Sequence, residues 1–317
     1  MTTNKTTRKV NPTGRRKGLI AVEPDNWRKE TLVSATEKAG GTVCPPEQAT
    51  ALIWAAPEQP ELLPDYIRDG HDWVQLPFAG IEPFIDMLDN QRLWSCGKGV
   101  YASAVAEHAL AMILALKRGI VDYSMGSSWG KPLGTNLFGS RVLILGGGGI
   151  TEELIPMLRP FKCSISVLRK SNEALLGCDQ ILTLEDLDIA LPETDILVVA
   201  LALTSETEGV VNKKRLDLLP SGAIVVNVAR GKHIITSDLV DALIDNEIAG
   251  AGLDVTEPEP LPDDHALWAL PNCLITPHTG NTPEMGIKLL ANRVEENVVR
   301  YIAGEPILGC VDISAGY

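Results

Sequence analysis

From residue 142 onward, short runs of apolar residues recur along the chain, and segments with helical spacing separate them. Continuous apolar runs are typical of strands that are covered on both faces, as in a parallel sheet. The pattern therefore predicts a doubly wound α/β domain. Its predicted strands read VLIL, SISVL, ILVVAL, AIVVNV, AGLDV and CLIT. One segment between them, SDLVDALIDNEI, predicts a helix with Ser237 as its N-cap.

The first hundred residues show a second, smaller alternation of the same kind. LIAVEP, ALIWAA and DWVQL have the composition of strands, and WRKETLVSATEKAG predicts a helix that ends in glycine. Near the C-terminus, Thr282 and Pro283 mark the start of a long helix that runs to Gly304. We expect this last helix to return to the first domain, so that two α/β domains share the chain.

Between the two alternating regions lies YASAVAEHALAMILALKRG, a helical segment that is apolar on nearly every side. It ends with Lys117, Arg118 and Gly119, as is typical of a helix C-terminus. Such a helix is expected to be buried. Packing between domains and packing against a second subunit both account for it.

The composition is that of a globular protein, and the length favours two domains of ordinary size. The chain has 317 residues, of which 45% are hydrophobic and 22% charged, and no apolar stretch is long enough to span a bilayer. A net charge of −13 disfavours nucleic acid as a partner. Residues 1–17 carry basic side chains without the apolar segment of a signal peptide, so we expect a flexible tail and no export.

The cysteines are scattered and show no CxxC spacing. This pattern favours reduced thiols in the cytoplasm over disulfides, and it indicates no metal site. The cysteines are Cys44, Cys96, Cys163, Cys178, Cys273 and Cys310.

Polar or glycine residues follow most of the predicted strands of the second region. In a parallel sheet these positions gather at the carboxyl edge, where ligands bind. Taken singly, each has an ordinary structural explanation, such as a turn, a helix cap or a loop histidine. Their coincidence at one edge favours a functional site. The residues are Gly146, Thr204, Arg230, Asp254 and His278.

The stretch GGGGIT resembles an incomplete GxGxxG fingerprint, in which Gly146 and Gly148 supply the first two glycines and Thr151 replaces the third. On its own it fits a flexible turn as well as a phosphate-binding loop.

Three side chains near the other strand ends suit acid–base chemistry on a carboxylate substrate. Arg230 matches the two oxygens of a carboxylate, and His278 is a suitable proton donor. A neighbouring carboxylate would orient the imidazole ring and raise its pKa. Spacing leaves both Glu257 and Glu259 as candidates for that carboxylate.

The segments VNVARG, LDVTEPEP and ITPHTG resemble the three signature segments of the D-isomer-specific 2-hydroxyacid dehydrogenases. LPFAGIE resembles the substrate-carboxylate loop of that family, and AVAEHALAMILALKRG its interdomain and dimer helix. The resemblance covers nearly the whole chain after residue 18. It implies a Rossmann cofactor domain, residues 105–282, inserted in a smaller flavodoxin-like substrate domain, residues 18–104 and 283–317.

The resemblance also implies roles for individual residues. Arg230 would bind the 2-oxo acid, His278 would protonate its carbonyl oxygen, and Glu259, five residues after Asp254, would pair with His278. Hydride would come from the nicotinamide cofactor. The residues expected to bind the cofactor are Gly146, Gly148, Gly149, Ile150, Thr204, Asp254 and Gly280. Those expected to bind the substrate are Trp54, Phe78, Ala79 and Gly80.

The choice between the two nicotinamide cofactors depends on the end of the second strand, which reads SVLRKS. Arg169 stands where an acidic residue normally accepts the ribose hydroxyls of NAD, and Lys170 and Ser171 follow it. Two cations and a hydroxyl favour a 2′-phosphate, so we expect NADP(H) to be preferred, with NAD(H) as the alternative. Stacking of Arg169 on adenine with little discrimination is the competing interpretation.

Phosphoglycerate dehydrogenases carry basic residues after the strand that here reads ALIWAAPEQ, whereas this chain has Trp54 followed by two alanines. The resemblance therefore favours a small 2-oxo acid such as glyoxylate or hydroxypyruvate, and Glu259 argues against formate dehydrogenases, which carry glutamine there. We expect a homodimeric 2-oxo acid reductase. D-3-phosphoglycerate dehydrogenase and a non-catalytic, corepressor-like nucleotide sensor are the alternatives.

Overall fold

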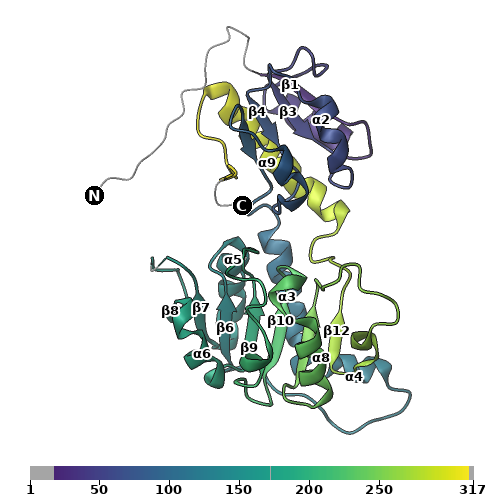
Figure 1. Ribbon diagram of the computed structural model, residues 1–317, viewed down its shortest axis with the longest axis vertical. Coiled ribbons are helices and arrows are strands. Elements are labelled where there is room, and N and C mark those ends of the chain that lie inside the picture. The colour runs from purple at the N-terminus through teal and green to yellow at the C-terminus, as the bar shows by residue number, and fades with distance from the viewer. Residues whose placement is uncertain (1–17, 172, 314–317) are drawn as a thin grey trace. The chain divides into compact units, whose positions relative to one another are not determined.

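The computed structural model describes residues 18–171 and 173–313, and the chain divides into two compact units (Figure 1). Unit 1 combines the chain up to Val100 with the segment from Pro283 onward, and unit 2 spans Tyr101–Thr282. The predicted basic tail, residues 1–17, lies outside the described residues.

Unit 2 is built on a parallel sheet of seven strands in the order β12-β11-β10-β9-β6-β7-β8. The chain passes from β6 to β7 and β8 on one side, then crosses to β9 on the other side. Strand order therefore reverses beside β6, which is where open α/β sheets bind ligands. The strands are β6 (Arg141–Leu145), β7 (Ser164–Leu168), β8 (Gln180–Leu182), β9 (Ile196–Val199), β10 (Ile224–Asn227), β11 (Gly250–Leu253) and β12 (Cys273–Ile275).

Helices cover both faces of this sheet, which explains why its strands are continuously apolar. Val142 and Ile144 of β6 join the core on one face, and Leu143 and Leu145 join the core on the other. The first core includes side chains of α3 (Ala102–Lys117) and α5 (Gly149–Leu158). The second core includes side chains of α6 (Leu187–Ala190), α7 (Lys213–Leu216) and α8 (Thr236–Ile244). The short helix α4 (Ile120–Met125) follows α3.

The long apolar helix predicted between the two regions is α3, and it packs on α5 and on strands β10 and β11. Ala106, Ala109, Met112 and Ile113 are buried in this contact. The helix is not buried on every side, because Ser103, Glu107 and Ala111 are exposed.

Unit 1 contains a second parallel sheet, with the strand order β2-β1-β3-β4-β5 that is typical of flavodoxin-like domains. Helices α1 (Lys29–Lys38) and α9 (Pro283–Ala303) pack together and share one core with the sheet. The other face is covered by α2 (Leu63–Tyr66) and the 3₁₀ turn Glu82–Met87. The strands are β1 (Leu19–Glu23), β2 (Thr42–Val43), β3 (Ala51–Trp54), β4 (Trp73–Gln75) and β5 (Leu93–Ser95). The α/β class with two parallel sheets is thus confirmed.

The strands that the apolar pattern did not predict are β2, β5 and β8, and each lies at the edge of its sheet. An edge strand has one neighbour, and in β2 and β8 this leaves Thr42 and Gln180 exposed. In β5 Trp94 and Ser95 are buried, but the strand has only three residues. The predicted cap of α8 was also wrong by two residues. Ile235 is the N-cap, and Ser237 lies within the helix.

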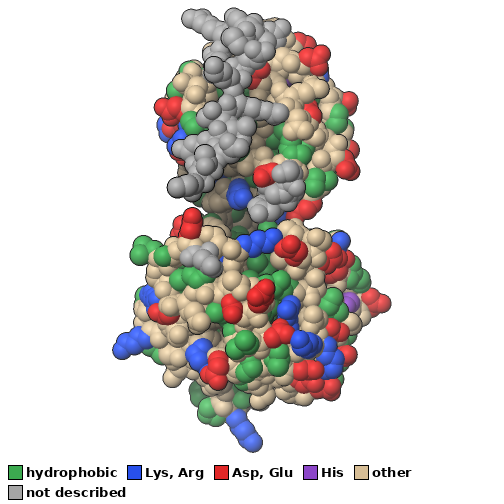
Figure 2. Space-filling model, turned by 60° about the vertical axis from the view of Figure 1, so that its left-hand side comes forward, with side chains coloured by type: hydrophobic (Ala, Val, Ile, Leu, Met, Phe, Trp, Pro, Cys, Tyr) green, Lys and Arg blue, Asp and Glu red, His purple; other side chains and the backbone are tan. Residues whose placement is uncertain are grey.

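Charged side chains of both signs are interspersed over the face of unit 2 that Figure 2 shows. None of the helices within residues 18–171 and 173–313 combines the length and apolar composition that a bilayer crossing requires. All six cysteines are free thiols.

Candidate active site

The candidate residues of unit 2 follow strands that are neighbours in the sheet. Gly146 comes directly after β6, Arg230 shortly after β10, Asp254 directly after β11 and His278 shortly after β12. Thr204 lies in the loop after β9, where its backbone N–H donates to Thr207 Oγ1 at 2.8 Å. Since all of these strands are parallel, these loops leave the same edge of the sheet.

The glycine-rich turn between β6 and α5 brings the backbone close to the end of β9. Gly146 has a φ of +110°, and a Cβ atom there would lie 2.4 Å from the carbonyl oxygen of Ala200, so only glycine fits. Gly148 is the N-cap of α5, and a Cβ atom on it would meet nothing within 4 Å. Gly149 and Ile150 form the first turn, whose N–H groups have no partner inside the helix. The turn therefore offers backbone donors beside open space, which fits a pyrophosphate.

Thr151 occupies the position of the third fingerprint glycine. Its side chain is buried, and its hydroxyl donates to the carbonyl oxygen of Gly146 at 2.6 Å. The hydroxyl is thus satisfied within the turn.

At the end of β7, Arg169 lies against the glycine turn. A Cβ atom on Gly147 would be 2.8 Å from Arg169 Cδ. Lys170 is exposed, and its ammonium pairs with Glu206 Oε2 at 2.6 Å. Ser171 Oγ accepts a hydrogen bond from the Glu173 backbone at 3.2 Å. Two cations therefore stand at the position of the usual acidic residue, one of them already paired with a carboxylate.

His278 and Glu259 are in direct contact, since Nδ1 of the imidazole lies 2.6 Å from Oε1 of the carboxylate. This hydrogen bond is the main cause that raises the pKa of His278, against the opposing effect of burial. It is likewise the main cause that lowers the pKa of Glu259. An ionised carboxylate only accepts, so Nδ1 carries a proton and Nε2 is the nitrogen that exchanges one with a ligand. Between the two predicted glutamates, the structure places Glu259, and not Glu257, at the imidazole.

Arg230 lies close enough to this pair for its charge to act on both members. After the contact with His278, the charge of Arg230 further lowers the pKa of Glu259. It also lowers the pKa of His278, although the hydrogen bond to Glu259 prevails. The structure thus brings the predicted imidazole and carboxylate into contact, and the charge of the predicted guanidinium acts on both.

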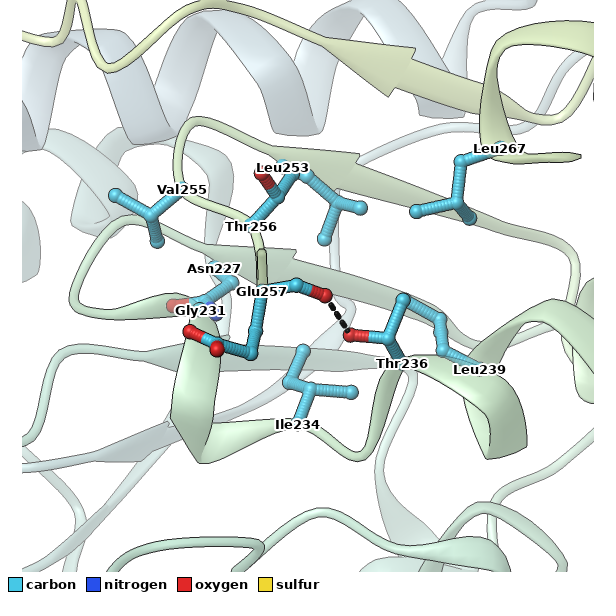
Figure 3. A pocket seen from close by; sticks show the side chains of 10 residues that line it. All are labelled: Asn227, Gly231, Ile234, Thr236, Leu239, Leu253, Val255, Thr256, Glu257 and Leu267. Carbon is cyan, nitrogen blue, oxygen red and sulfur yellow. Dashed lines mark hydrogen bonds between the residues drawn. The ribbon is translucent and has the colours of Figure 1, made fainter. Parts of the chain in front are cut away.

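The turn that carries Arg230 touches the loop that carries Glu259. A Cβ atom on Gly231 would lie 1.9 Å from the carbonyl oxygen of Thr256, so the two backbones meet at this glycine. In Figure 3, Gly231 lies beside Thr256 and Glu257. Thr236 joins the same two segments, because its hydroxyl donates to the Glu257 carbonyl oxygen at 2.6 Å.

Asp254 is a buried carboxylate that holds the loop after β12. Its Oδ1 accepts from Thr276 Oγ1 at 2.6 Å and from the Thr279 backbone at 2.8 Å, and its Oδ2 accepts from the Gly280 backbone at 2.9 Å. Burial is the largest single influence and acts to raise the pKa of Asp254. Hydrogen bonds, including one from His108, outweigh it and lower this pKa to about 2.

The arrangement around Asp254 leaves room for one more donor. Oδ1 accepts from Thr276 and Thr279 and lies 3.4 Å from His108 Nε2, whereas one hydrogen bond ends on Oδ2. A carboxylate oxygen can accept two hydrogen bonds, so the free position is on Oδ2. Asp254 also supports the catalytic candidate, because its carbonyl oxygen accepts from the His278 backbone at 2.8 Å.

Four further residues contact Asp254, Thr276 or Arg230 and were not among the candidates from the sequence. They are His108, Asn227, His233 and Thr276. His108 Nε2 lies 2.9 Å from Thr276 Oγ1. Asn227 and His233 both contact the carbonyl oxygen of Arg230. Asn227 ends a buried apolar strand and Thr276 follows one, so their position at the sheet edge was the available signal.

In unit 1, Phe78, Ala79 and Gly80 lie in the loop after β4, and Phe78 and Ala79 are exposed. The Phe78 carbonyl oxygen accepts from the Gly97 backbone at 2.7 Å, which ties the loop to the segment after β5. Trp54 corrects an expectation. Its side chain is fully buried in the core, and its indole N–H donates to the Ala56 carbonyl oxygen at 2.7 Å, so it has no surface left to contact a substrate.

Comparison with known proteins agrees with this geometry. The profile of the family described as "D-isomer specific 2-hydroxyacid dehydrogenase, NAD binding domain" matches residues 110–280. The chain is 38% identical over 271 residues to an uncharacterized protein in the proB 3′ region of Corynebacterium melassecola, covering 83% of this chain and 88% of that one. It is 30% identical to glyoxylate/hydroxypyruvate reductase A of Salmonella newport, covering 73% of this chain and 75% of that protein.

Among solved structures, the chain is similar to a D-isomer specific 2-hydroxyacid dehydrogenase of Xanthobacter autotrophicus Py2 in complex with NADPH and MES. The TM-score is 0.81 at 28% sequence identity, and the match covers 95% of this chain and all of that one. The chain therefore belongs to the D-isomer specific 2-hydroxyacid dehydrogenase family and is an NAD(P)-dependent oxidoreductase that acts on hydroxy acids.

Proposed function

We propose that this protein is a 2-oxo acid reductase of the glyoxylate/hydroxypyruvate type that prefers NADP(H) to NAD(H). The observation that carries the proposal is the 2.6 Å contact between His278 and Glu259. It provides a proton donor whose charged form the carboxylate favours, and the charge of Arg230 influences both groups.

In this proposal Arg230 binds the carboxylate of the substrate. A guanidinium offers two parallel N–H donors that match the two carboxylate oxygens, which fixes the orientation of the bound acid. The same positive charge favours 2-oxo acids over neutral carbonyl compounds.

His278 donates the proton that the carbonyl oxygen gains on reduction, and it does so from Nε2 because Nδ1 faces Glu259. Glu259 holds the imidazolium and fixes the direction of the ring. The nicotinamide cofactor supplies the hydride when it is bound. In the oxidative direction, neutral His278 accepts the hydroxyl proton through the same nitrogen.

The residues that would hold the cofactor are those of the glycine turn, Arg169 and Asp254. Open space at Gly148 and the first-turn N–H groups of α5 suit the pyrophosphate. The free accepting capacity of Asp254 Oδ2 suits the carboxamide N–H₂ of nicotinamide, with Gly280 beside it. The cation at Arg169 supports a 2′-phosphate, as does the NADPH named for the solved relative.

A small substrate is supported by the residues that follow β3 in unit 1. Ala55, Ala56 and Pro57 are buried and uncharged, and the loop with Phe78 carries no cation. A phosphorylated substrate such as 3-phosphoglycerate needs cations, so that alternative is disfavoured. The relative named glyoxylate/hydroxypyruvate reductase A supports the same choice.

A homodimer is supported by apolar side chains that are exposed on the segment after α3. A second copy of the chain would cover them. They are Ile120, Tyr123, Trp129, Leu133 and Phe138. The free cysteines agree with the expected cytoplasmic location.

The test is a panel of 2-oxo acids assayed with each reduced cofactor by loss of absorbance at the nicotinamide band. We expect turnover with glyoxylate and hydroxypyruvate, and a higher kcat/KM with NADPH than with NADH. Activity confined to 3-phosphohydroxypyruvate would favour the phosphoglycerate dehydrogenase alternative. Tight NADPH binding without consumption on any acid would favour the sensor.

A further inference from the structure

The carbonyl oxygen of Arg230 is held by two buried side chains. Asn227 Nδ2 donates to it at 2.9 Å, and His233 Nδ1 lies 3.0 Å from it. Both side chains are almost completely buried, with exposed fractions of 1% for Asn227 and 0% for His233. The backbone N–H of His233 donates to the same oxygen at 3.2 Å, so this carbonyl has two buried side-chain partners and one backbone partner.

The contact fixes the protonation of the His233 ring. Burial is the main influence on this group and lowers the pKa of His233, although the backbones of Ala202 and Arg230 act in the opposite direction. A neutral imidazole carries a single proton, and a carbonyl oxygen can only accept. Within the described residues Nε2 has no hydrogen-bond partner, whereas Nδ1 faces the Arg230 carbonyl oxygen, so we assign the proton to Nδ1.

His233 is itself fixed by the neighbouring loop. Its carbonyl oxygen accepts from the Val211 backbone at 2.9 Å, and the carbonyl oxygen of Lys232 accepts from the Gly209 backbone at 2.8 Å. Gly231, between Arg230 and these residues, is in close contact with Thr256. Arg230 is thus connected to the segment with Gly209 and Val211 through Lys232 and His233, and to the segment with Thr256 through Gly231.

The peptide unit is planar, so only the φ and ψ angles of a residue can rotate. The direction of the Arg230 carbonyl group is therefore coupled to the orientation of the Arg230 Cα atom, which carries the side chain. A donor that holds the Arg230 carbonyl oxygen also restricts the rotation about its Cα. The guanidinium is carried on a flexible stem, so its placement over a substrate depends on how firmly that Cα is oriented.

We propose that His233 is a positioning residue for Arg230, acting through the hydrogen bond from Nδ1 to the Arg230 carbonyl oxygen. It need not touch the substrate. The inference rests on the proposed role of Arg230 as the group that binds the substrate carboxylate. It predicts that loss of the Nδ1 donor affects the binding of the 2-oxo acid and leaves the binding of the cofactor unchanged.

The matched variants are His233→Phe and His233→Asn. Phenylalanine keeps the aromatic shape without a donor, whereas asparagine places an N–H₂ group on Cγ, the same atom that bears Nδ1 in histidine. We expect His233→Phe to raise KM for glyoxylate about 3- to 20-fold, the range for one buried hydrogen bond whose acceptor keeps other donors. His233→Asn should remain within about threefold of wild type.

A residue that only fills the core would also change KM through a general loss of order, so the decisive readout is a double-mutant cycle with Arg230→Lys. If His233 acts through the guanidinium, the effect of His233→Phe disappears when Arg230 is lysine. The Kd for NADPH, measured by fluorescence titration, should be equal in all four proteins.

Asn227→Leu provides a second test if His233→Phe does not fold, because it removes the other side-chain donor to the same carbonyl oxygen. It too should raise KM for glyoxylate, and the effect should disappear in the Arg230→Lys background. Equal effects of the substitutions in both backgrounds, with Arg230→Lys itself strongly impaired, would overturn the positioning role alone. Wild-type kcat/KM in Arg230→Lys would instead overturn the anchor role and this inference with it.

Discussion

Nδ1 of His278 lies 2.6 Å from Oε1 of Glu259, although the two residues come from loops that follow different strands. Those strands, β11 and β12, are neighbours in the sheet, and this brings the two loops together. The carboxylate favours the charged imidazolium, which is the form that can donate a proton to a carbonyl oxygen.

Replacement of Glu259 by glutamine should shift the pH dependence of reduction. The reductive reaction needs protonated His278, so its rate falls as the pH rises through the pKa of this group. Glu259 raises that pKa, and its loss should therefore move the alkaline limb of kcat/KM for glyoxylate to lower pH. The measurement is the pH profile of kcat/KM at saturating NADPH.

Glu257→Gln is the matched control for that experiment. The Glu257 backbone accepts from Thr236, and the carboxylate paired with His278 belongs to Glu259. We expect its pH profile to coincide with that of the wild-type protein. An unmoved profile in Glu259→Gln, or an equal shift in both variants, would contradict the pairing.

Arg230→Lys keeps the positive charge and removes the planar pair of donors. Since the bidentate contact orients the acid as well as binding it, we expect a higher KM for glyoxylate together with a lower kcat. The two constants are separated by initial rates at varied glyoxylate. A change in KM alone would mean that Arg230 attracts the acid without orienting it.

Arg169 and Lys170 should contribute unequally to the choice of cofactor. Arg169→Ala should lower kcat/KM for NADPH by about 10- to 100-fold, the range for a hydrogen bond to a charged group, and leave NADH nearly unaffected. Lys170→Ala should cost less than about fivefold, because its ammonium is exposed and already pairs with Glu206. Equal losses with both cofactors in Arg169→Ala would indicate stacking on adenine.

Replacement of Gly146 or Gly148 by alanine should affect the stability of the protein differently. Gly146→Ala places a side chain on a residue with a left-handed backbone conformation and against the Ala200 carbonyl oxygen. We therefore expect the free energy of unfolding to fall by about 1–3 kcal/mol. Gly148→Ala meets open space and should leave stability within about 0.5 kcal/mol.

Gly148→Ala, which should leave stability unchanged, should weaken the binding of the cofactor. The methyl group of Gly148→Ala would occupy the space proposed for the pyrophosphate, so its Kd for NADPH should rise about tenfold while urea unfolding is unchanged. Unchanged affinity in this variant would place the pyrophosphate elsewhere.

The central strands were predictable because their residues are buried on both faces, so that Val142 to Leu145 form one unbroken apolar run. Edge strands such as Gln180–Leu182 lack that signal. The sheet edge where the candidate site lies was predictable for the same reason, since polar residues after buried parallel strands gather there. The choice of Glu259 over Glu257 was not available from spacing, and it came from the resemblance.

Contacts between loops could not be predicted from the sequence pattern. Nothing in the pattern indicates that Glu206 pairs with Lys170, or that His233 reaches back to the carbonyl oxygen of Arg230. Trp54 shows the opposite error, because the resemblance led us to expect a substrate contact whereas the side chain is packed in the core. Such contacts depend on the tertiary packing of segments that are distant in the chain.

The most direct test of the whole account is the effect of His278→Gln on glyoxylate reduction with NADPH. Glutamine cannot act as the general acid, so kcat should fall by about 10²- to 10⁴-fold, with the Kd for NADPH nearly unchanged. A variant that turns over glyoxylate at the wild-type rate would contradict the assignment of His278 as the proton donor, and with it the proposed mechanism.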